Sequence, residues 1–152
     1  MRYLLYNPLS GKENRPRKEA ECYEVASDVP TELISITEVS DLRVFFENLK
    51  PCDDVVIFGG DGTLNKIANL LSDSLISNPI YYHPCGTGND FARDIGIGEG
   101  KEPVLINDYI QGLPTVTING ESHKFINGVG FGIDGYCCEV GDVLKGQGKS
   151  PN

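Results

Sequence analysis

The sequence is poor in basic residues. It has 13 Lys and Arg against 22 Asp and Glu, which gives a formal net charge of −9. A protein whose main partner is nucleic acid needs a basic face for the phosphate backbone, so this composition argues against nucleic acid. Four basic residues do cluster near the N-terminus: Lys12, Arg15, Arg17 and Lys18. The cluster is read as a solvated loop and helix start or, alternatively, as a patch near anionic phosphates or an anionic membrane.

Long apolar runs and paired cysteines are lacking as well. No run of about 18 apolar residues occurs, and the apolar stretch at the N-terminus is too short for a signal peptide. The cysteines are odd in number and never spaced C-x-x-C, and a disulfide between the adjacent Cys137 and Cys138 would be strained. The histidines, His83 and His123, lie in no metal-ligand pattern. We therefore expect a soluble, cytoplasmic chain with reduced cysteines.

Most of the sequence alternates between short apolar runs and helical patterns. The runs predict strands at 2–6, 31–37, 55–58 and 79–82, and the patterns between them predict helices at 16–27, 41–49 and 63–71. Strands alternating with helices imply βαβ units. The predicted fold class is therefore α/β, a three-layer sandwich with a mainly parallel sheet and helices on both faces.

The pattern changes near Pro114. Residues 115–119 alternate, Asn119-Gly120 is a strong hairpin turn, and 122–127 are read as the return strand. Residues 128–140 continue in a β-like pattern, and the last twelve, from Gly141, show no closing element. We therefore predict an α/β domain over 1–113 and the beginning of a second, β-rich domain over 114–152.

The start of such a second domain would leave strand edges and apolar side chains uncovered. The expected uncovered side chains are Phe125, Ile126 and Val129. Association with another copy of the chain, giving a homo-oligomer, is one way to cover them.

Three loops rich in small residues each follow a predicted strand. They are NPLSG at 7–11, GGDGT at 59–63 and GTGND at 86–90. Because the carboxyl ends of parallel strands share one edge of a sheet, the three loops should meet there. Glycines let backbone N–H groups approach an anion, so the loops predict a phosphate site, although capped glycine turns are the alternative. The sequence contains neither a Walker A motif nor a G-x-G-x-x-G fingerprint at the first turn.

Two polar side chains of the GGDGT loop have open roles. Asp61 would hold water or a metal ion, or would orient a neighbouring loop. Thr63 would cap the following helix and give a hydroxyl to an anion.

The motifs NPLSG, GGDGTLN and GTGNDFAR, in this order and spacing, resemble the diacylglycerol kinase catalytic domain family. That family includes bacterial lipid kinases and sphingosine kinases and is more distantly similar to NAD kinases and phosphofructokinases. FINGVGFGIDG at 125–135 resembles the strand that starts the second domain of the family. The resemblance implies transfer of the γ-phosphoryl group of ATP to a lipid hydroxyl, such as that of diacylglycerol, with Mg²⁺.

The resemblance also implies site residues, by matching motifs. The nucleotide would be contacted by Asn7, Pro8, Leu9, Ser10, Gly11, Thr37, Gly59, Gly60, Asp61, Gly62, Thr63, Leu64, Asn65, Lys66, Gly86, Thr87, Gly88 and Asn89. Asp61 and Asp90 would order water and metal. No residue qualifies as the catalytic base.

Two departures from the family pattern stand out. Lys66 occupies a position where the family most often has Glu, and an Asp common in bacterial members is missing before the strand that begins at Pro114. Family members are about twice as long, in keeping with two ordinary domains. We therefore expect the ATP-binding half of a lipid kinase, inactive as this fragment, whose lipid partner and peripheral membrane contact depend on the second domain. The alternatives are a different acceptor, such as a sphingoid base or a soluble alcohol, or a non-catalytic nucleotide-binding module.

Overall fold

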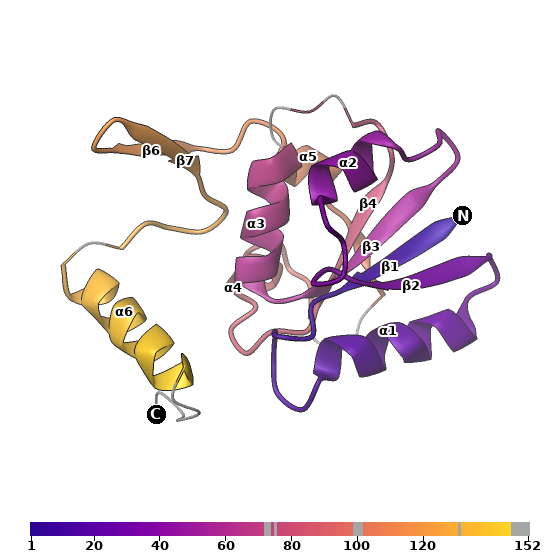
Figure 1. Ribbon diagram of the computed structural model, residues 1–152, viewed down its shortest axis with the longest axis horizontal. Coiled ribbons are helices and arrows are strands. Elements are labelled where there is room, and N and C mark those ends of the chain that lie inside the picture. Colours follow the sequence, from indigo (N-terminus) through magenta and orange to yellow (C-terminus); the bar gives the residue numbers. More distant parts are fainter. Residues whose placement is uncertain (72–73, 75, 99–101, 131, 147–152) are drawn as a thin grey trace.

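The computed structural model describes the chain except for residues 72–73, 75, 99–101, 131 and 147–152 (Figure 1). The elements, in chain order, are β1 (Arg2–Tyr6), α1 (Arg15–Ala26), β2 (Thr31–Ser35), α2 (Leu42–Glu47), β3 (Asp54–Gly59), α3 (Asp61–Leu71), β4 (Ile80–Pro84), α4 (Asp90–Asp94), β5 (Val104–Leu105), α5 (Asn107–Ile110), β6 (Thr115–Ile118), β7 (Glu121–Lys124) and α6 (Ile133–Gly146).

Five strands form one sheet in the order β2-β1-β3-β4-β5. The first four are parallel, with Leu4 opposite both Leu33 and Val56, whereas β5 runs antiparallel to β4. The predicted parallel sheet is therefore confirmed, with one antiparallel edge strand. It follows that the ends of β1, β3 and β4 lie along a common edge.

Helices cover both faces of this sheet. On one face, α2, α3, α4 and α5 pack on side chains such as Leu5, Ile57 and Tyr82, and on the other α1 packs on Leu4 and Phe58 (Figure 1). Because β3 is covered on both sides, residues 55–58 are fully buried, which explains why they form an unbroken apolar run. The predicted three-layer α/β fold is confirmed.

Two predicted element boundaries differ from the structure near the loops. α3 begins at Asp61 rather than at residue 63, because the N–H of Leu64 donates to the carbonyl oxygen of Gly60 at 3.0 Å. β2 ends at Ser35, so Thr37 follows the strand in a turn instead of ending it. GGDGT is thus half loop and half first helical turn.

The prediction for residues after the hairpin was wrong. β6 and β7 do pair around Asn119 and Gly120, whose φ angles of 53° and 87° suit a two-residue hairpin turn. Residues 133–140, predicted as β-like, instead begin α6, and the described residues of 125–135 form no strand. The segment from Gly141 was also wrongly expected to lack a closing element, since α6 extends to Gly146. Apolar residues at 133, 136, 140 and 143 recur every three to four positions, which is a helical period that sequence reasoning overlooked.

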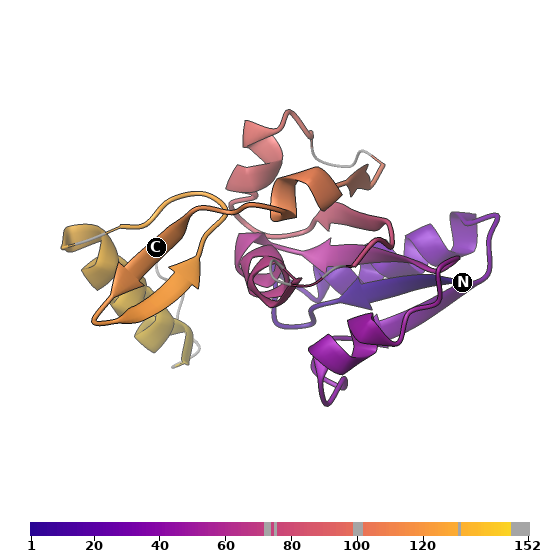
Figure 2. The ribbon, with the colours of Figure 1, turned by 90° about the horizontal axis from the view of Figure 1, so that it is seen from above.

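β6, β7 and α6 extend to one side of the α/β layers in both views, with the end of β7 beside α3 (Figures 1 and 2). Ile133 and Tyr136 on α6 are 76% and 65% exposed. Of the three side chains expected to be uncovered, Val129 is exposed, Phe125 is half-buried, and Ile126 packs against the main core. Uncovered apolar surface is therefore present, but chiefly on α6; the division into two domains remains a prediction.

Two further expectations concern the cysteines and membrane segments. All five cysteines are free, as predicted, with only Cys85 buried. Within the residues that the structure describes, none of the helices has the length and apolarity needed to cross a lipid bilayer.

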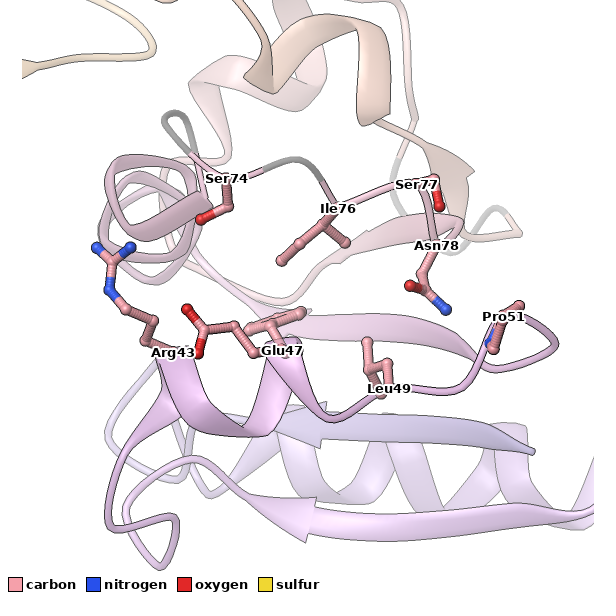
Figure 3. Close-up of a pocket in the computed structure, with 9 residues that line it drawn as sticks. Arg43, Glu47, Leu49, Pro51, Ser74, Ile76, Ser77 and Asn78 are labelled. Atoms are coloured by element: carbon pink, nitrogen blue, oxygen red, sulfur yellow. The ribbon is translucent and has the colours of Figure 1, made fainter.

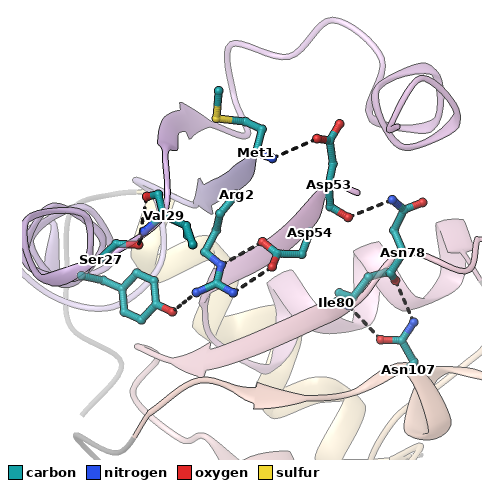
Figure 4. A network of polar contacts seen from close by, with 10 residues as sticks. Met1, Arg2, Ser27, Val29, Asp53, Asp54, Asn78, Ile80 and Asn107 are labelled. Carbon is teal, nitrogen blue, oxygen red and sulfur yellow. Dashed lines mark hydrogen bonds and ion pairs between the residues drawn. The ribbon is translucent and has the colours of Figure 1, made fainter. Parts of the chain in front are cut away.

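The amino ends of the strands are joined by polar contacts (Figure 4). The Arg2 guanidinium donates to both carboxylate oxygens of Asp54 at 2.8 Å and to the Tyr23 hydroxyl at 2.7 Å. The hydrogen bonds to Asp54 raise the pKa of Arg2. The Asn78 amide donates to the Asp53 carbonyl at 2.9 Å, and Asn107 binds the backbone of residues 78 and 80. This end of the sheet is therefore closed by internal bonds.

We expect Asp54→Asn to lower the free energy of unfolding by about 1–3 kcal/mol, because it leaves the half-buried Arg2 charge with a poorer partner. The matched control is Glu21→Gln, which weakens an Arg17–Glu21 pair of similar length, 2.7 Å, on the exposed face of α1. The control should cost at most about 0.5 kcal/mol. Urea unfolding of both variants measures this, and equal losses would contradict the assigned role of the Arg2–Asp54 pair.

Candidate functional site

The NPLSG and GGDGT loops are joined at the carboxyl edge of the sheet. The Asn7 side-chain amide donates to the Thr63 hydroxyl at 2.7 Å, and the N–H of Gly60 donates to the Ser10 hydroxyl at 2.9 Å. Thr63 is 5% exposed and lies inside the first turns of α3, so its hydroxyl serves the neighbouring loop instead of capping the helix. The expected meeting of these two loops is confirmed.

Asp61 joins GGDGT to GTGND. Its carboxylate accepts from the N–H groups of Asp90 at 3.1 Å and Phe91 at 3.0 Å, at the start of α4. Of the roles considered for Asp61, orientation of a neighbouring loop is therefore the one that the contacts support. These bonds spread the Asp61 charge over two donors and hold α4 at the site.

Most of the loop glycines are required by packing between loops. A Cβ on Gly86 would lie 2.6 Å from the Cα of Gly60, and one on Gly60 would lie 3.0 Å from the Cα of Gly86. A Cβ on Gly59 would lie 2.7 Å from the Thr63 side chain, and Gly11 combines a φ of 70° with a 2.5 Å approach to the Cys85 carbonyl. For these four, close packing accounts for the glycine without a ligand.

Gly62 differs from the other glycines of GGDGT. A Cβ there would meet nothing within 4 Å, and the residue is exposed. It lies in the first turn of α3, where backbone N–H groups have no partner within the helix. The N–H groups of Gly60 and Gly86, by contrast, are already bound, by Ser10 and by the Asn89 side chain at 2.8 Å. The first turn of α3 therefore presents exposed backbone N–H donors beside the loops, a feature that can bind an anion.

The remaining predicted site residues divide into open and enclosed groups. Leu64 is fully buried in the core, so only its backbone can face a ligand, and Asn89 is 3% exposed and closes its own loop through Gly86. The open ones are listed by exposure: Leu9, Thr37, Lys66, Thr87 and Asp90 are exposed, and Asn7, Pro8, Ser10, Asn65 and Gly88 are half-buried. Thr37 follows β2, and its hydroxyl lies 2.8 Å from that of Ser35.

The carboxylates predicted to bind metal lie near each other. A Cβ on Gly88 would sit 3.4 Å from one oxygen of Asp61 and 3.4 Å from one oxygen of Asp90. Asp90 also pairs with Arg93 at 3.0 Å. Among the described residues, no group of three or more His, Cys, Asp or Glu is arranged to hold a metal ion. The donors present, two carboxylates beside an anion surface, fit Mg²⁺, which takes one or two carboxylates and completes its shell with phosphate and water.

Buried groups at the end of β4 hold the carboxyl edge in place. The Tyr82 hydroxyl donates to the Gly59 carbonyl at 3.2 Å, and the N–H of Cys85 donates to the same oxygen at 2.7 Å. Burial raises the pKa of Tyr82, and it raises the pKa of the Cys85 thiol to about 12, so this cysteine is inert. Sequence reasoning missed Tyr82, since nothing in a buried strand marks one tyrosine as a loop support.

A surface pocket of about 460 Å³ lies elsewhere (Figure 3). Its lining includes Arg43 and Glu47 of α2 and residues 76–78, which lead into the amino end of β4. It is therefore at the opposite edge of the sheet from the three loops, and none of the predicted site residues lines it.

Two of the four residues of the N-terminal basic cluster, Arg15 and Arg17, are paired with carboxylates. Arg15 pairs with Glu19 at 3.3 Å and Arg17 with Glu21 at 2.7 Å, both across one turn of α1. These pairs favour the reading of the cluster as a solvated helix face.

Comparison with known proteins identifies the family of the chain. A family model described as "Diacylglycerol kinase catalytic domain" matches residues 2–117. The chain belongs to this family. Diacylglycerol kinases of Staphylococcus aureus strains bovine RF122 / ET3-1 and MRSA252 are each 33% identical over 129 residues, covering 80% of this chain. A crystal structure of a diacylglycerol kinase from Bacillus anthracis str. Sterne matches with a TM-score of 0.53 and 25% identity, over 65% of this chain and 36% of that one.

The match to the family is partial in length. The chain spans 37% of the length of the Staphylococcus aureus diacylglycerol kinases that it matches. The resemblance inferred from the motifs is confirmed, and the family match ends inside β6, next to the hairpin.

We expect Gly86→Ala to destabilise the fold by about 1–3 kcal/mol, because its methyl group meets the backbone of Gly60 and not a flexible side chain. Gly62→Ala is the matched control. It should leave stability unchanged or raise it by up to about 1 kcal/mol, since alanine is the better helix former. Urea unfolding compares the two, and a Gly86→Ala variant as stable as wild type would refute the loop contact.

A second expectation concerns pH. His83 is 8% exposed, and burial lowers its pKa from 6.5. The charge of Arg15 lowers this pKa further, whereas the charges of Glu19 and Glu102 raise it and so oppose the shift. The unfolded chain therefore binds a proton that the folded chain resists, so stability is complete above pH 6.5 and falls as the pH drops below it.

The measurement is the difference in unfolding free energy between wild type and His83→Leu, followed from about pH 8 to about pH 5.5. As the pH falls, the unfolding free energy of His83→Leu should rise relative to that of wild type. His123→Leu, which removes an exposed histidine of β7, is the control substitution measured beside it. A parallel slope for wild type and His83→Leu would show that His83 does not titrate as assigned.

Proposed function

We propose that this chain is the ATP-binding half of a lipid kinase that transfers the γ-phosphoryl group of ATP to diacylglycerol or a related lipid hydroxyl. The family match supports kinase chemistry, and the relatives' name supports diacylglycerol as acceptor. The observation that carries the proposal is the first turn of α3, where Gly62 is exposed and has open space around it. The neighbouring loops are held in place by hydrogen bonds to Thr63, Gly60 and Asp61.

The proposed phosphate contacts are backbone ones. The N–H groups of Gly62 and Thr63 lie in the first turn of α3, and the helix dipole adds partial positive charge there. Asp61 would repel phosphate if its carboxylate faced the ligand. Each of its oxygens accepts one bond from the start of α4, which offsets part of that charge, and each keeps a lone pair for a metal ion. The same residue would therefore assemble the site and hold a cation beside the phosphates.

Mg²⁺ would supply charge neutralisation between the phosphates. Asp61 and Asp90, which flank Gly88, are the residues that would hold it, together with water and phosphate oxygens. Lys66 is exposed on α3, one turn beyond the phosphate surface. In place of the usual glutamate it removes a carboxylate from the site, and we propose that nucleotide binding is weak for this reason.

Transfer to the lipid requires a base and a wall for the acceptor. The chain spans 37% of the length of its relatives, and we assign the role of base to none of the described residues beside the loops. We therefore propose that residues 1–152 alone bind ATP–Mg²⁺ and phosphorylate diacylglycerol poorly.

The decisive variant is Gly62→Ala. We expect at least about a tenfold loss of ATP–Mg²⁺ affinity in titration calorimetry, because the methyl group occupies the space through which a phosphate reaches the backbone. The loss should come without loss of stability. Gly128→Ala is the matched control, since a Cβ there also meets nothing within 4 Å but lies far along the chain from the three loops.

Unchanged affinity in Gly62→Ala would overturn the assignment of the phosphates to α3. A radiolabel transfer assay on diacylglycerol micelles tests the second half of the proposal. Efficient lipid phosphorylation by residues 1–152 would overturn it.

A further inference from the structure

Asn69, a side chain of α3, binds the hairpin of β6 and β7. Its Oδ1 accepts from the Lys124 N–H at 2.9 Å, and its Nδ2 donates to the Lys124 carbonyl at 2.7 Å. Both backbone groups of Lys124 are thus bound by a single amide. This is the pattern that a neighbouring strand would offer, supplied here by a helix side chain.

The register of the hairpin explains why Lys124 is available to α3. The N–H of Phe125 donates across the hairpin to the Pro114 carbonyl at 3.2 Å. Because alternate residues of an antiparallel strand point their polar backbone groups to opposite sides, those of Lys124 point away from β6. They face α3, beside which the end of β7 lies (Figure 1).

The amide of Asn69 is held in the orientation that this contact needs. Its Nδ2 also donates to the Asn65 carbonyl, one turn earlier on α3, at 2.9 Å. Turning the amide over would place its NH₂ group against the Lys124 N–H and its oxygen against two carbonyls. The helix therefore prepares the side chain for Lys124, and Asn69 is half-buried in the contact.

We propose that Asn69 is a positioning residue that fixes the hairpin, and the chain that follows it, relative to the phosphate-binding turn. α3 carries both features: its first turn at residues 61–63 and Asn69 near its other end. At 1.5 Å per residue the two lie about 12 Å apart along a rigid axis. The family match ends at residue 117, so Asn69 joins the matched part of the chain to what comes after it. The contact between Asn69 and Lys124 does not depend on the proposed function. Its importance for phosphoryl transfer rests on that function.

Amide hydrogen exchange on the whole chain tests the docking. In wild type, the Lys124 N–H should exchange about tenfold or more slowly than the Ser122 N–H, which points to the same side of β7 two residues away. Asn69→Ala should abolish this difference, while the amides of β1 and β3 keep their protection. Equal exchange of the two amides in wild type would overturn the proposal, whether or not the variant folds.

The orientation of the hairpin relative to the five-stranded sheet is the readout that a merely stabilising role of Asn69 would leave unchanged. Residual dipolar couplings of the hairpin and the five-stranded sheet should fit one alignment tensor in wild type and two in Asn69→Ala. The control Asn48→Ala removes a similar bond, from a side-chain amide to the Val44 carbonyl at 2.8 Å on α2, and should keep one tensor. A single tensor in Asn69→Ala would overturn the proposal. ATP–Mg²⁺ titration of wild type tests the proposed function separately, so either idea can fail alone.

Discussion

The close approach of the Gly60 and Gly86 backbones is the contact on which the candidate site depends. β3 and β4 are neighbours in the sheet, so the chains leaving them must pass each other before α3 and α4 begin. Any side chain at either glycine would push these chains apart. Their contact brings Asp61 within reach of the α4 N–H groups and aligns the first turn of α3 with the edge.

The two edges of the sheet have opposite characters, and this follows from how their polar groups are satisfied. At the amino edge, the Arg2–Asp54 pair and the Asn78–Asn107 contacts bind charges and backbone groups to each other. At the carboxyl edge, bonds between loops use the N–H groups of Gly60 and Gly86 but leave a helix N-terminus facing outward. Burial of every donor would give a stable edge without a ligand site; the structure instead leaves the first turn of α3 exposed at Gly62.

The sheet and the meeting of the loops could be predicted from sequence because both follow from local patterns. Apolar runs of period two or of full burial mark strands, and loops after parallel strands must share an edge. The reasons for individual glycines could not be predicted, since Gly60 and Gly86 are 26 residues apart and their contact exists only in three dimensions. The motif alone treats its glycines alike, whereas in the structure Gly59 and Gly60 are packed closely and Gly62 has open space around it.

The same distinction explains the errors and omissions after residue 113. The hairpin was predictable because Asn119-Gly120 sets its own turn. α6 was not predicted, because four glycines between residues 128 and 135 are poor helix formers and obscure the helical period at the start of α6. Asn69 carries no signal in sequence: an asparagine on a half-buried helix face is ordinary until a strand edge lies beside it. Since a helix transmits position along its axis with little deformation, placing that asparagine on α3 relates the hairpin to the proposed phosphate-binding turn through one rigid element. A contact through a loop would have allowed the two to move independently.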